Sequence, residues 1–269
     1  MNVTREGAYM KVTILGARGS IPTEGKDMLE FGGGTSCVLV ESADRAIYLD
    51  AGTGITGTPD IGDKAISILL THPHLDHILG FPFFPYISEK NRKIDIYAAK
   101  SGDLGAFEQL EALYKNPFWP CGLKDYPSDV EFHDITFPLT IGDFTVTGIP
   151  SVHPGGSVVY RLENSGRSLV YATDYEYEED KAEDLIRFSE GCDLLLFDAQ
   201  YTDEEFEARR GFGHSTVAQG MTVMEKSGAK SIRFVHHDPR HTDEFLRKME
   251  EPVKSDTVAF ARKDEVIIL

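Results

Sequence analysis

A seven-residue motif, THPHLDH at residues 71–77, carries four side chains that can bind metal ions. It follows an apolar run that predicts a buried strand. His72 and His74 are two positions apart, so an extended backbone points both the same way. Asp76 and His77 are adjacent, and a turn into a helix there would direct them towards a second ion. Imidazole and carboxylate ligands favour zinc, manganese or iron over calcium. The motif therefore predicts a metal site at a strand end.

Other potential ligands follow strand-like runs further along the chain. They are His153, Asp174 and His236. A single histidine or aspartate in such a place is more often an ordinary loop residue. His236 is followed by His237, and strand alternation points one of the two inward and the other outward. Residue type alone leaves that choice open, although we favour His236.

His214 lies just before a predicted helix that starts at Ser215 and Thr216. Free N–H groups at a helix N-terminus can bind an anion. The alternative is that Ser215 caps the helix and that His214 is solvated. Asp198 ends an apolar run and by itself is a plain strand-end residue.

The motif and these positions resemble the metallo-β-lactamase fold superfamily along nearly the whole chain. The residues at 71–77 match its signature. Asp50 matches the first motif, in which such an aspartate supports the metal loop. His153, Asp174 and His236 match the later motifs in the family's order.

The resemblance implies an α/β fold, an αββα sandwich of two mixed sheets flanked by helices. It also implies two divalent metal ions, with zinc favoured and manganese or iron as alternatives. Asp174 would bridge the ions, which would share a hydroxide that attacks the substrate while Asp76 helps orient it. The remaining ligands would be His72, His74 and His153 at one ion and Asp76, His77 and His236 at the other.

Residues 213–216, Gly-His-Ser-Thr, resemble an element of ribonuclease Z-like phosphodiesterases. That resemblance implies that His214 contacts the scissile phosphate or protonates the leaving oxygen, with Asp198 nearby. Uncharacterised bacterial hydrolases of this branch are the nearest match. We therefore expect an enzyme, a phosphodiesterase for a small phosphodiester or cyclic nucleotide. The alternatives are hydrolysis of a carboxylic ester, lactone or thioester, and a metal-binding module without catalysis.

Transfer RNA is not the expected substrate. Ribonuclease Z enzymes that process transfer RNA carry a long arm between the third and fourth motifs. Here His153 and Asp174 are only 21 positions apart, and one predicted hairpin with its turn at 164–167 fills the gap. The net charge of −17 also works against binding nucleic acid or an anionic membrane. A small molecule is the expected partner.

Length and composition indicate a globular protein. The chain has 269 residues, and no apolar run approaches the roughly 20 residues that a membrane-spanning helix needs. The three cysteines form no CxxC pair, which favours a reducing, cytoplasmic setting. We expect residues 1–9 to be a disordered extension and residues 10–269 to be a single domain.

Strands outnumber helices in the expected element order. Strand-like runs cover residues 11–15, 36–41, 46–50, 65–70, 93–98, 144–149, 158–163, 168–172, 193–198, 231–236 and 258–261. Helical patterns cover residues 105–115, 180–189, 215–227 and 242–249.

Two further features have competing interpretations. The aromatic segments 81–86 and 116–122 could stack on a flat substrate group, or they could form core or dimer contacts, which leaves a homodimer open. Arg18, in a glycine-rich loop, could pair with a phosphate or form a structural ion pair.

Overall fold

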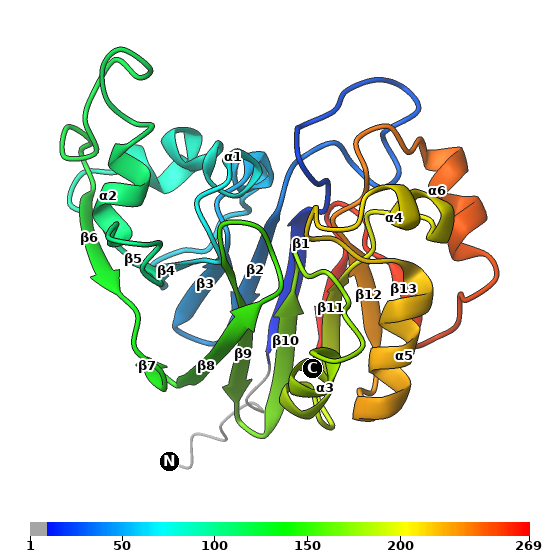
Figure 1. Ribbon diagram of the computed structural model, residues 1–269. Coiled ribbons are helices and arrows are strands. Elements are labelled where there is room, and N and C mark those ends of the chain that lie inside the picture. The colour runs from blue at the N-terminus through cyan, green and yellow to red at the C-terminus, as the bar shows by residue number, and fades with distance from the viewer. Residues whose placement is uncertain (1–9) are drawn as a thin grey trace.

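Two β-sheets face each other in the computed structural model, which describes residues 10–269 (Figure 1). The expected extension at residues 1–9 lies outside these residues. In spatial order the first sheet consists of β14 (Val266–Ile268), β1 (Lys11–Gly16), β2 (Cys37–Glu41), β3 (Arg45–Leu49), β4 (Ala65–Leu70), β5 (Lys93–Ala98) and β6 (Asp129–Asp134). The second consists of β13 (Val258–Phe260), β12 (Ile232–Val235), β11 (Leu194–Asp198), β10 (Arg167–Ala172), β9 (Ser157–Asn164), β8 (Phe144–Ser151) and β7 (Leu139–Ile141).

Each sheet is antiparallel on one side and parallel on the other. In the first sheet the change comes at β3, which pairs antiparallel with β2 and parallel with β4. In the second it comes at β10, which pairs antiparallel with β9 and parallel with β11. Loops after the carboxyl ends of parallel strands are the usual place for ligand sites in such sheets. In Figure 1 the short helices α1 and α4, which follow β4 and β11, lie at one edge of the sandwich.

The central core lies between the sheets. It is formed by alternate, fully buried side chains of facing strands, such as Val12 and Val40 in the first sheet and Leu162 and Leu196 in the second. Every other residue of a strand points to the same face, so the strands that lie beneath a covering layer also present apolar side chains outward, as Ile68 of β4 does. Both sheets therefore have apolar areas on their outer faces, and these areas need covering layers.

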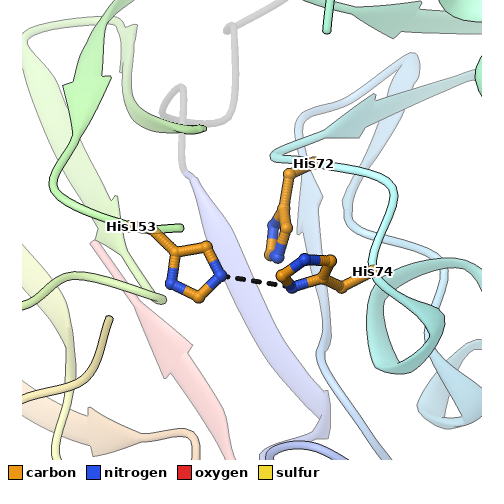
Figure 2. A group of neighbouring side chains, drawn as sticks. All are labelled: His72, His74 and His153. Carbon is orange, nitrogen blue, oxygen red and sulfur yellow. Dashed lines mark hydrogen bonds between the residues drawn. The ribbon is translucent and has the colours of Figure 1, made fainter. Parts of the chain in front are cut away.

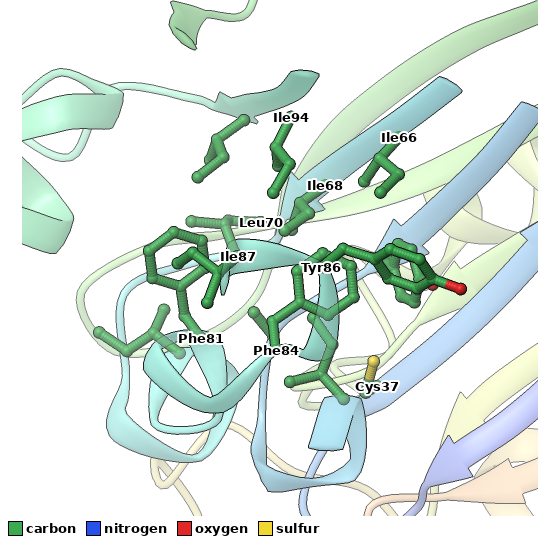
Figure 3. Close-up of a cluster of buried hydrophobic side chains, with 14 of the residues drawn as sticks. Cys37, Ile66, Ile68, Leu70, Phe81, Phe84, Tyr86, Ile87 and Ile94 are labelled. Atoms are coloured by element: carbon green, nitrogen blue, oxygen red, sulfur yellow. The ribbon is translucent and has the colours of Figure 1, made fainter. Parts of the chain in front are cut away.

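Helices cover the two outer faces. On the first sheet the cover includes α1 (Leu75–Ile78), α2 (Ala106–Glu111) and the 3-10 turns η1 (Thr53–Gly57), η2 (Phe81–Phe83) and η3 (Pro85–Ser88), whose side chains join the cluster in Figure 3. On the second sheet α3 (Ala182–Phe188), α5 (Val217–Ser227) and α6 (Asp243–Glu250) pack over another cluster. The remaining helix is α4 (Asp203–Ala208). This is the αββα sandwich expected from the sequence.

The expected strands and helices are present, with local differences. The turn at residues 164–167 joins β9 and β10 as predicted. The sequence prediction missed β6, β7, β14 and α4. The helix expected from residue 215 begins two residues later, because Thr216 rather than Ser215 is its cap and accepts a hydrogen bond from the Gln219 N–H.

The aromatic segment at residues 81–86 belongs mainly to the core. Phe81, Phe84 and Tyr86 are buried in the cluster on the outer face of the first sheet (Figure 3). Phe83 is 64% exposed and contacts Trp119 edge-on. Most of these rings are therefore committed to packing.

Arg18 is a structural residue. Its side chain is fully buried, and its guanidinium donates to the carbonyl oxygens of Gly32, Asp238 and His241 at 2.7–3.0 Å. It joins the loop after β1 to the loop after β12. These bonds differ from both sequence interpretations, the phosphate contact and the ion pair, because the partners are backbone carbonyls.

None of the helices within residues 10–269 has the length and apolar character needed to cross a bilayer.

A buried carboxylate joins α6 to the edge of the second sheet. Glu250 accepts hydrogen bonds from the guanidinium of Arg262 at 2.7–2.8 Å and from the Phe260 N–H at 2.9 Å. Burial opposes ionisation of Glu250, but Arg262, the Phe260 N–H and Lys254 together lower its pKa to about 2. The folded state therefore holds this carboxylate ionised.

We predict that Glu250→Gln lowers the free energy of unfolding at pH 7 by about 2–3 kcal/mol. Because the pKa of Glu250 is depressed in the folded state, its contribution is complete above the unfolded pKa of 4.5 and disappears as the pH falls towards 2. Urea denaturation should show wild type and variant converging over this interval. Glu244→Gln, an exposed position on the same helix, is the control and should leave the profile unchanged. A constant difference from pH 7 to pH 3 would contradict the prediction.

Candidate metal centre

The ends of strands from both sheets supply the candidate ligands. His72 and His74 follow β4, and Asp76 and His77 begin α1. The second sheet contributes the loop between β8 and β9 and the residues after β10 and β12, which carry His153, Asp174 and His236.

Three residues at these strand ends adopt the left-handed conformation. Asp50, Asp174 and His236 have φ values of 63°, 51° and 62°. Such a conformation costs of order 1–3 kcal/mol for a residue other than glycine and persists only where its surroundings impose it. Here it turns the backbone sharply at the end of each strand, so that the side chain enters the space between the two sheets.

The first group of potential ligands is His72, His74 and His153. Figure 2 shows the three imidazoles converging from two loops. His74 Nδ1 and His153 Nε2 are 3.2 Å apart, and the His72 and His74 ring centroids are 4.3 Å apart. His72 is buried, whereas His74 is exposed. The centre therefore opens to solvent at His74.

The second group is Asp76, His77, Asp174 and His236, all of them buried. Within each group the potential ligand atoms lie within 4.8 Å of one another. Asp174 connects the groups, because its Oδ1 is 3.7 Å from His72 Nε2 and its Oδ2 is 3.1 Å from His77 Nε2. Asp174 therefore lies between the two groups, and its bridging role stays a prediction.

Hydrogen bonds hold the imidazoles by the nitrogen that faces away from the centre. His77 Nδ1 donates to Asp50 at 2.7 Å, and His236 Nδ1 donates to Gln200 Oε1 at 2.9 Å. His153 Nδ1 donates to a backbone carbonyl at 3.2 Å. An imidazole held in this way directs its other nitrogen at the centre, which is the usual arrangement of metal-binding histidines, and a metal ion would replace the proton on that nitrogen.

The buried charges of the centre stabilise one another. Burial opposes ionisation of Asp174, but His236, His77 and His72 hold its pKa well below the usual range. Burial alone would lower the pKa of His236, but Asp174 and the hydrogen bond to Asp76 raise it to about 9. The carboxylates are therefore anionic at neutral pH and provide the negative charge that a cation needs.

These residues fit a pair of transition-metal ions. Among residues 10–269, the buried His72 Nε2 and His77 Nε2 face the Asp174 carboxylate but form no well-aligned hydrogen bond. Unpaired buried nitrogens cost free energy, and a metal ion satisfies them. The donor set of imidazoles and carboxylates suits zinc, manganese or iron. His72, His74 and His153 would hold one ion and Asp76, His77 and His236 the other, with Asp174 between them.

His236 and its neighbour His237 point in different directions. His236 Nε2 lies 3.1 Å from Asp76 and 3.3 Å from Asp174. His237 points away, donates to the Ala261 carbonyl at 3.0 Å and stacks on Phe260. Burial and the nearby Arg18 lower the pKa of His237 to about 3, so it is a neutral core residue.

His214 lies beside the centre and is held by Asp198. Its Nδ1 donates to Asp198 Oδ2 at 2.8 Å. Its ring stacks on His236 at a centroid distance of 4.8 Å and lies 5.5 Å from the His153 ring. Asp198 also accepts from the backbone N–H of Asp174 at 3.0 Å, so one carboxylate positions both His214 and the proposed bridging residue.

Sequence reasoning missed several residues that position the ligands. The Ser20 N–H donates to Asp76 Oδ2 at 2.7 Å, and Gln200 anchors His236. Glu176 accepts from the N–H groups of Gly211 and Gly213 and thereby shapes the loop before His214. In the sequence, Glu176 and Gln200 each lie two residues after an expected site residue, Asp174 and Asp198, and this is the only signal that could have indicated them. Ser20 has no such neighbour among the expected ligands.

Gly19 and Gly213 are required by close contacts. A Cβ on Gly19 would overlap the imidazole of His236, and a Cβ on Gly213 would overlap that of His153. Each glycine therefore lets a backbone segment lie against a ligand ring.

We predict that Asp174→Ala weakens the binding of both ions, because Asp174 lies next to both groups of ligands. The purified variant should hold fewer than one ion per chain, whereas the wild type should hold two when metal is saturating. Elemental analysis after dialysis measures this. The control is Asp193→Ala, another buried strand-end aspartate, which pairs with Lys230 far from the centre. Two tightly held ions in Asp174→Ala would remove Asp174 from its assigned position.

A second prediction concerns Gly19. Gly19→Ala should displace His236 and weaken the ion held by Asp76, His77 and His236 by about 10–100-fold, the effect typical of disturbing a ligand's support. Competition with a chromogenic chelator measures the two affinities. Gly57→Ala should change neither, since its Cβ would lie 3.9 Å from the nearest atom. Equal affinities in wild type and Gly19→Ala would show that His236 is not a ligand.

Comparison with known proteins agrees with this geometry. The chain is 25% identical to the probable metallo-hydrolase YhfI of Bacillus subtilis over 266 residues, covering 94% of this chain and 97% of that protein. It is 23% identical to ribonuclease Z of Haloarcula marismortui, covering 86% and 87% of the two chains. The crystal structure of YhfI superimposes with a TM-score of 0.74 at 23% identity, covering 98% of this chain and all of that one.

The family assignment rests on the sequence match. Residues 45–237, nearly three quarters of the chain, match the family described as beta-lactamase superfamily domain. The matched segment runs from β3 to the residue after His236 and so contains every candidate ligand. The chain therefore belongs to the β-lactamase superfamily.

Proposed function

We propose that this protein is a metal-dependent hydrolase of small phosphodiesters, including cyclic nucleotides. The observation that carries the proposal is the pair formed by His214 and Asp198, which lies next to the candidate metal centre. Hydrolysis of a phosphodiester needs negative charge neutralised at phosphorus and a proton delivered to the departing oxygen. The structure supports a separate residue for the second task.

In this proposal the bound ions and the protein side chains have different tasks. Bound divalent ions would supply Lewis acidity, which neutralises charge on phosphate oxygens and makes water nucleophilic near neutral pH. Asp76, kept ionised by His77 and His236, orients the attacking water. His214 would be the acid for the leaving oxygen, because its Nδ1 is bound to Asp198 and its Nε2 is not used by that bond.

The form of the chain favours a small substrate over transfer RNA. Between His153 and Asp174 the chain forms only the hairpin of β9 and β10, whose strands pair along most of their length. The net charge of −17 repels a polyanion, and it repels a single phosphodiester much less. Among the relatives, a ribonuclease Z and a structure described as a diphosphatase are named for reactions at phosphorus.

We predict that His214→Ala keeps its metal content and fold but loses about 10²–10⁴ in kcat on a phosphodiester with an alkoxide leaving group, the usual contribution of a positioned acid. A 2′,3′-cyclic nucleotide is a suitable substrate. The loss should be smaller with bis-p-nitrophenyl phosphate, because p-nitrophenolate departs without a proton.

The control for this variant is His133→Ala, which removes a half-exposed histidine of β6 that is paired with Asp95. It should leave both rates unchanged. Loss of metal from His214→Ala would instead make His214 a ligand. Unchanged kinetics on every phosphodiester would remove His214 from its role as the acid. Hydrolysis of a carboxylic ester, lactone or thioester by the wild type, with no turnover of any phosphodiester, would overturn the proposal.

A further inference from the structure

A cavity of about 370 Å³ lies beside the candidate metal centre, between the edges of the two sheets. Its walls come from the segments after β5 and β6 on one side and from β8 and β9 on the other. His72 and Pro73 of the metal-binding motif also line it. We call this cavity the Phe137 pocket. Its volume falls within the range of small-molecule sites.

The Phe137 pocket adjoins His74 on the exposed side of the centre. Gly155 lines the pocket, and a Cβ at that position would lie only 3.8 Å from His74 Nε2. His74 is the exposed candidate ligand. A substrate whose phosphorus lies at the centre can therefore extend a substituent past His74 into the pocket.

The chemistry of the walls is mainly apolar. Ile135, Phe137 and Ile149 are half-buried and present hydrocarbon surface to the cavity. Phe137 lies against Gly148 of β8, where a Cβ would overlap its ring. None of the described residues that line the pocket is an aspartate or glutamate, although the chain carries 44 of them. The walls therefore accept a neutral apolar group without repelling an attached phosphate.

The pocket also has polar lining residues, among them Lys100, Ser101 and Gln109, and a buried hydroxyl. Ser157 lines it and is only 7% exposed, and its Oγ has no hydrogen-bond partner among residues 10–269. A buried hydroxyl without a partner costs free energy, which an occupant with a polar edge would recover. Ser157 is therefore available to contact an occupant of the pocket.

We propose that the Phe137 pocket binds a ring-sized, mainly apolar substituent of the substrate and so selects phosphodiesters that carry an aromatic or similarly flat group. The inference rests on the proposed function, because it takes the phosphorus to lie at the metal centre. The pocket is then a specificity site, and His214 and the ligands remain the groups that act on the phosphoryl centre.

The test compares the binding of phenyl phosphate and inorganic phosphate to the metal-loaded protein by isothermal titration calorimetry. Phenyl phosphate should bind about tenfold more tightly, the effect of removing roughly 60 Å² of ring surface from water at about 25 cal/mol per Å². Ile135→Trp, which fills the pocket, and Ile135→Asp, which adds a charge to its wall, should each reduce the preference to within about twofold. Neither variant should change the affinity for inorganic phosphate.

Thr136→Trp is the matched control, because Thr136 is the exposed neighbour of Ile135 and does not line the pocket. It should keep the tenfold preference. Equal binding of the two ligands by the wild type, or a preference that survives both Ile135 variants, would overturn the inference.

Measuring both binding and turnover distinguishes a failure of this inference from a failure of the proposed function. If no phosphodiester is hydrolysed but the preference depends on Ile135, the pocket stands and the function fails. If phosphodiesters are hydrolysed and the preference is independent of Ile135, the function stands and the pocket inference fails.

Discussion

The buried carboxylate of Asp50 is the constraint on which the site depends. It is fully buried at the end of β3 and accepts hydrogen bonds from the Thr71 N–H and hydroxyl, from His77 Nδ1 and from the Tyr171 hydroxyl. An isolated carboxylate would cost several kcal/mol to bury, so these donors must all be in place. Because Tyr171 belongs to the opposite sheet, the same carboxylate fixes the metal-binding loop and joins the two sheets.

The metal centre exists only where the sandwich closes. The first sheet supplies the ligands in the motif at residues 71–77, and the second supplies His153, Asp174 and His236. The apolar core between the sheets holds these loops at a fixed separation. The fold therefore holds the anionic carboxylates and the oriented imidazoles together at the ends of the strands. Metal binding would in turn stabilise the folded state, since the unfolded chain has no such site.

Much of the fold could be predicted, because most strands are apolar, rich in β-branched residues and bounded by turn residues. The exceptions have physical reasons. β6 lies at a sheet edge and is largely polar on its exposed side, and β7 and β14 are three residues long, so none of them carries a strong hydrophobic pattern. Arg18 was ambiguous because a buried arginine bound to carbonyls has no local sequence signal. The aromatic rings of residues 81–86 were ambiguous because the local sequence does not show which rings the tertiary structure buries.

The sequence by itself determined the residue types of the centre, since the spacing in residues 71–77 and the strand-end positions of Asp174 and His236 are local properties. Only the tertiary structure decided that His236 faces the centre while His237 packs on Phe260. It also decided that Gln200 and Gly19 determine the orientation of His236, and that Asp198 reaches both His214 and Asp174. These contacts join residues far apart in the chain. They follow from the strand register and from the left-handed turns after β10 and β12, which no short stretch of sequence specifies.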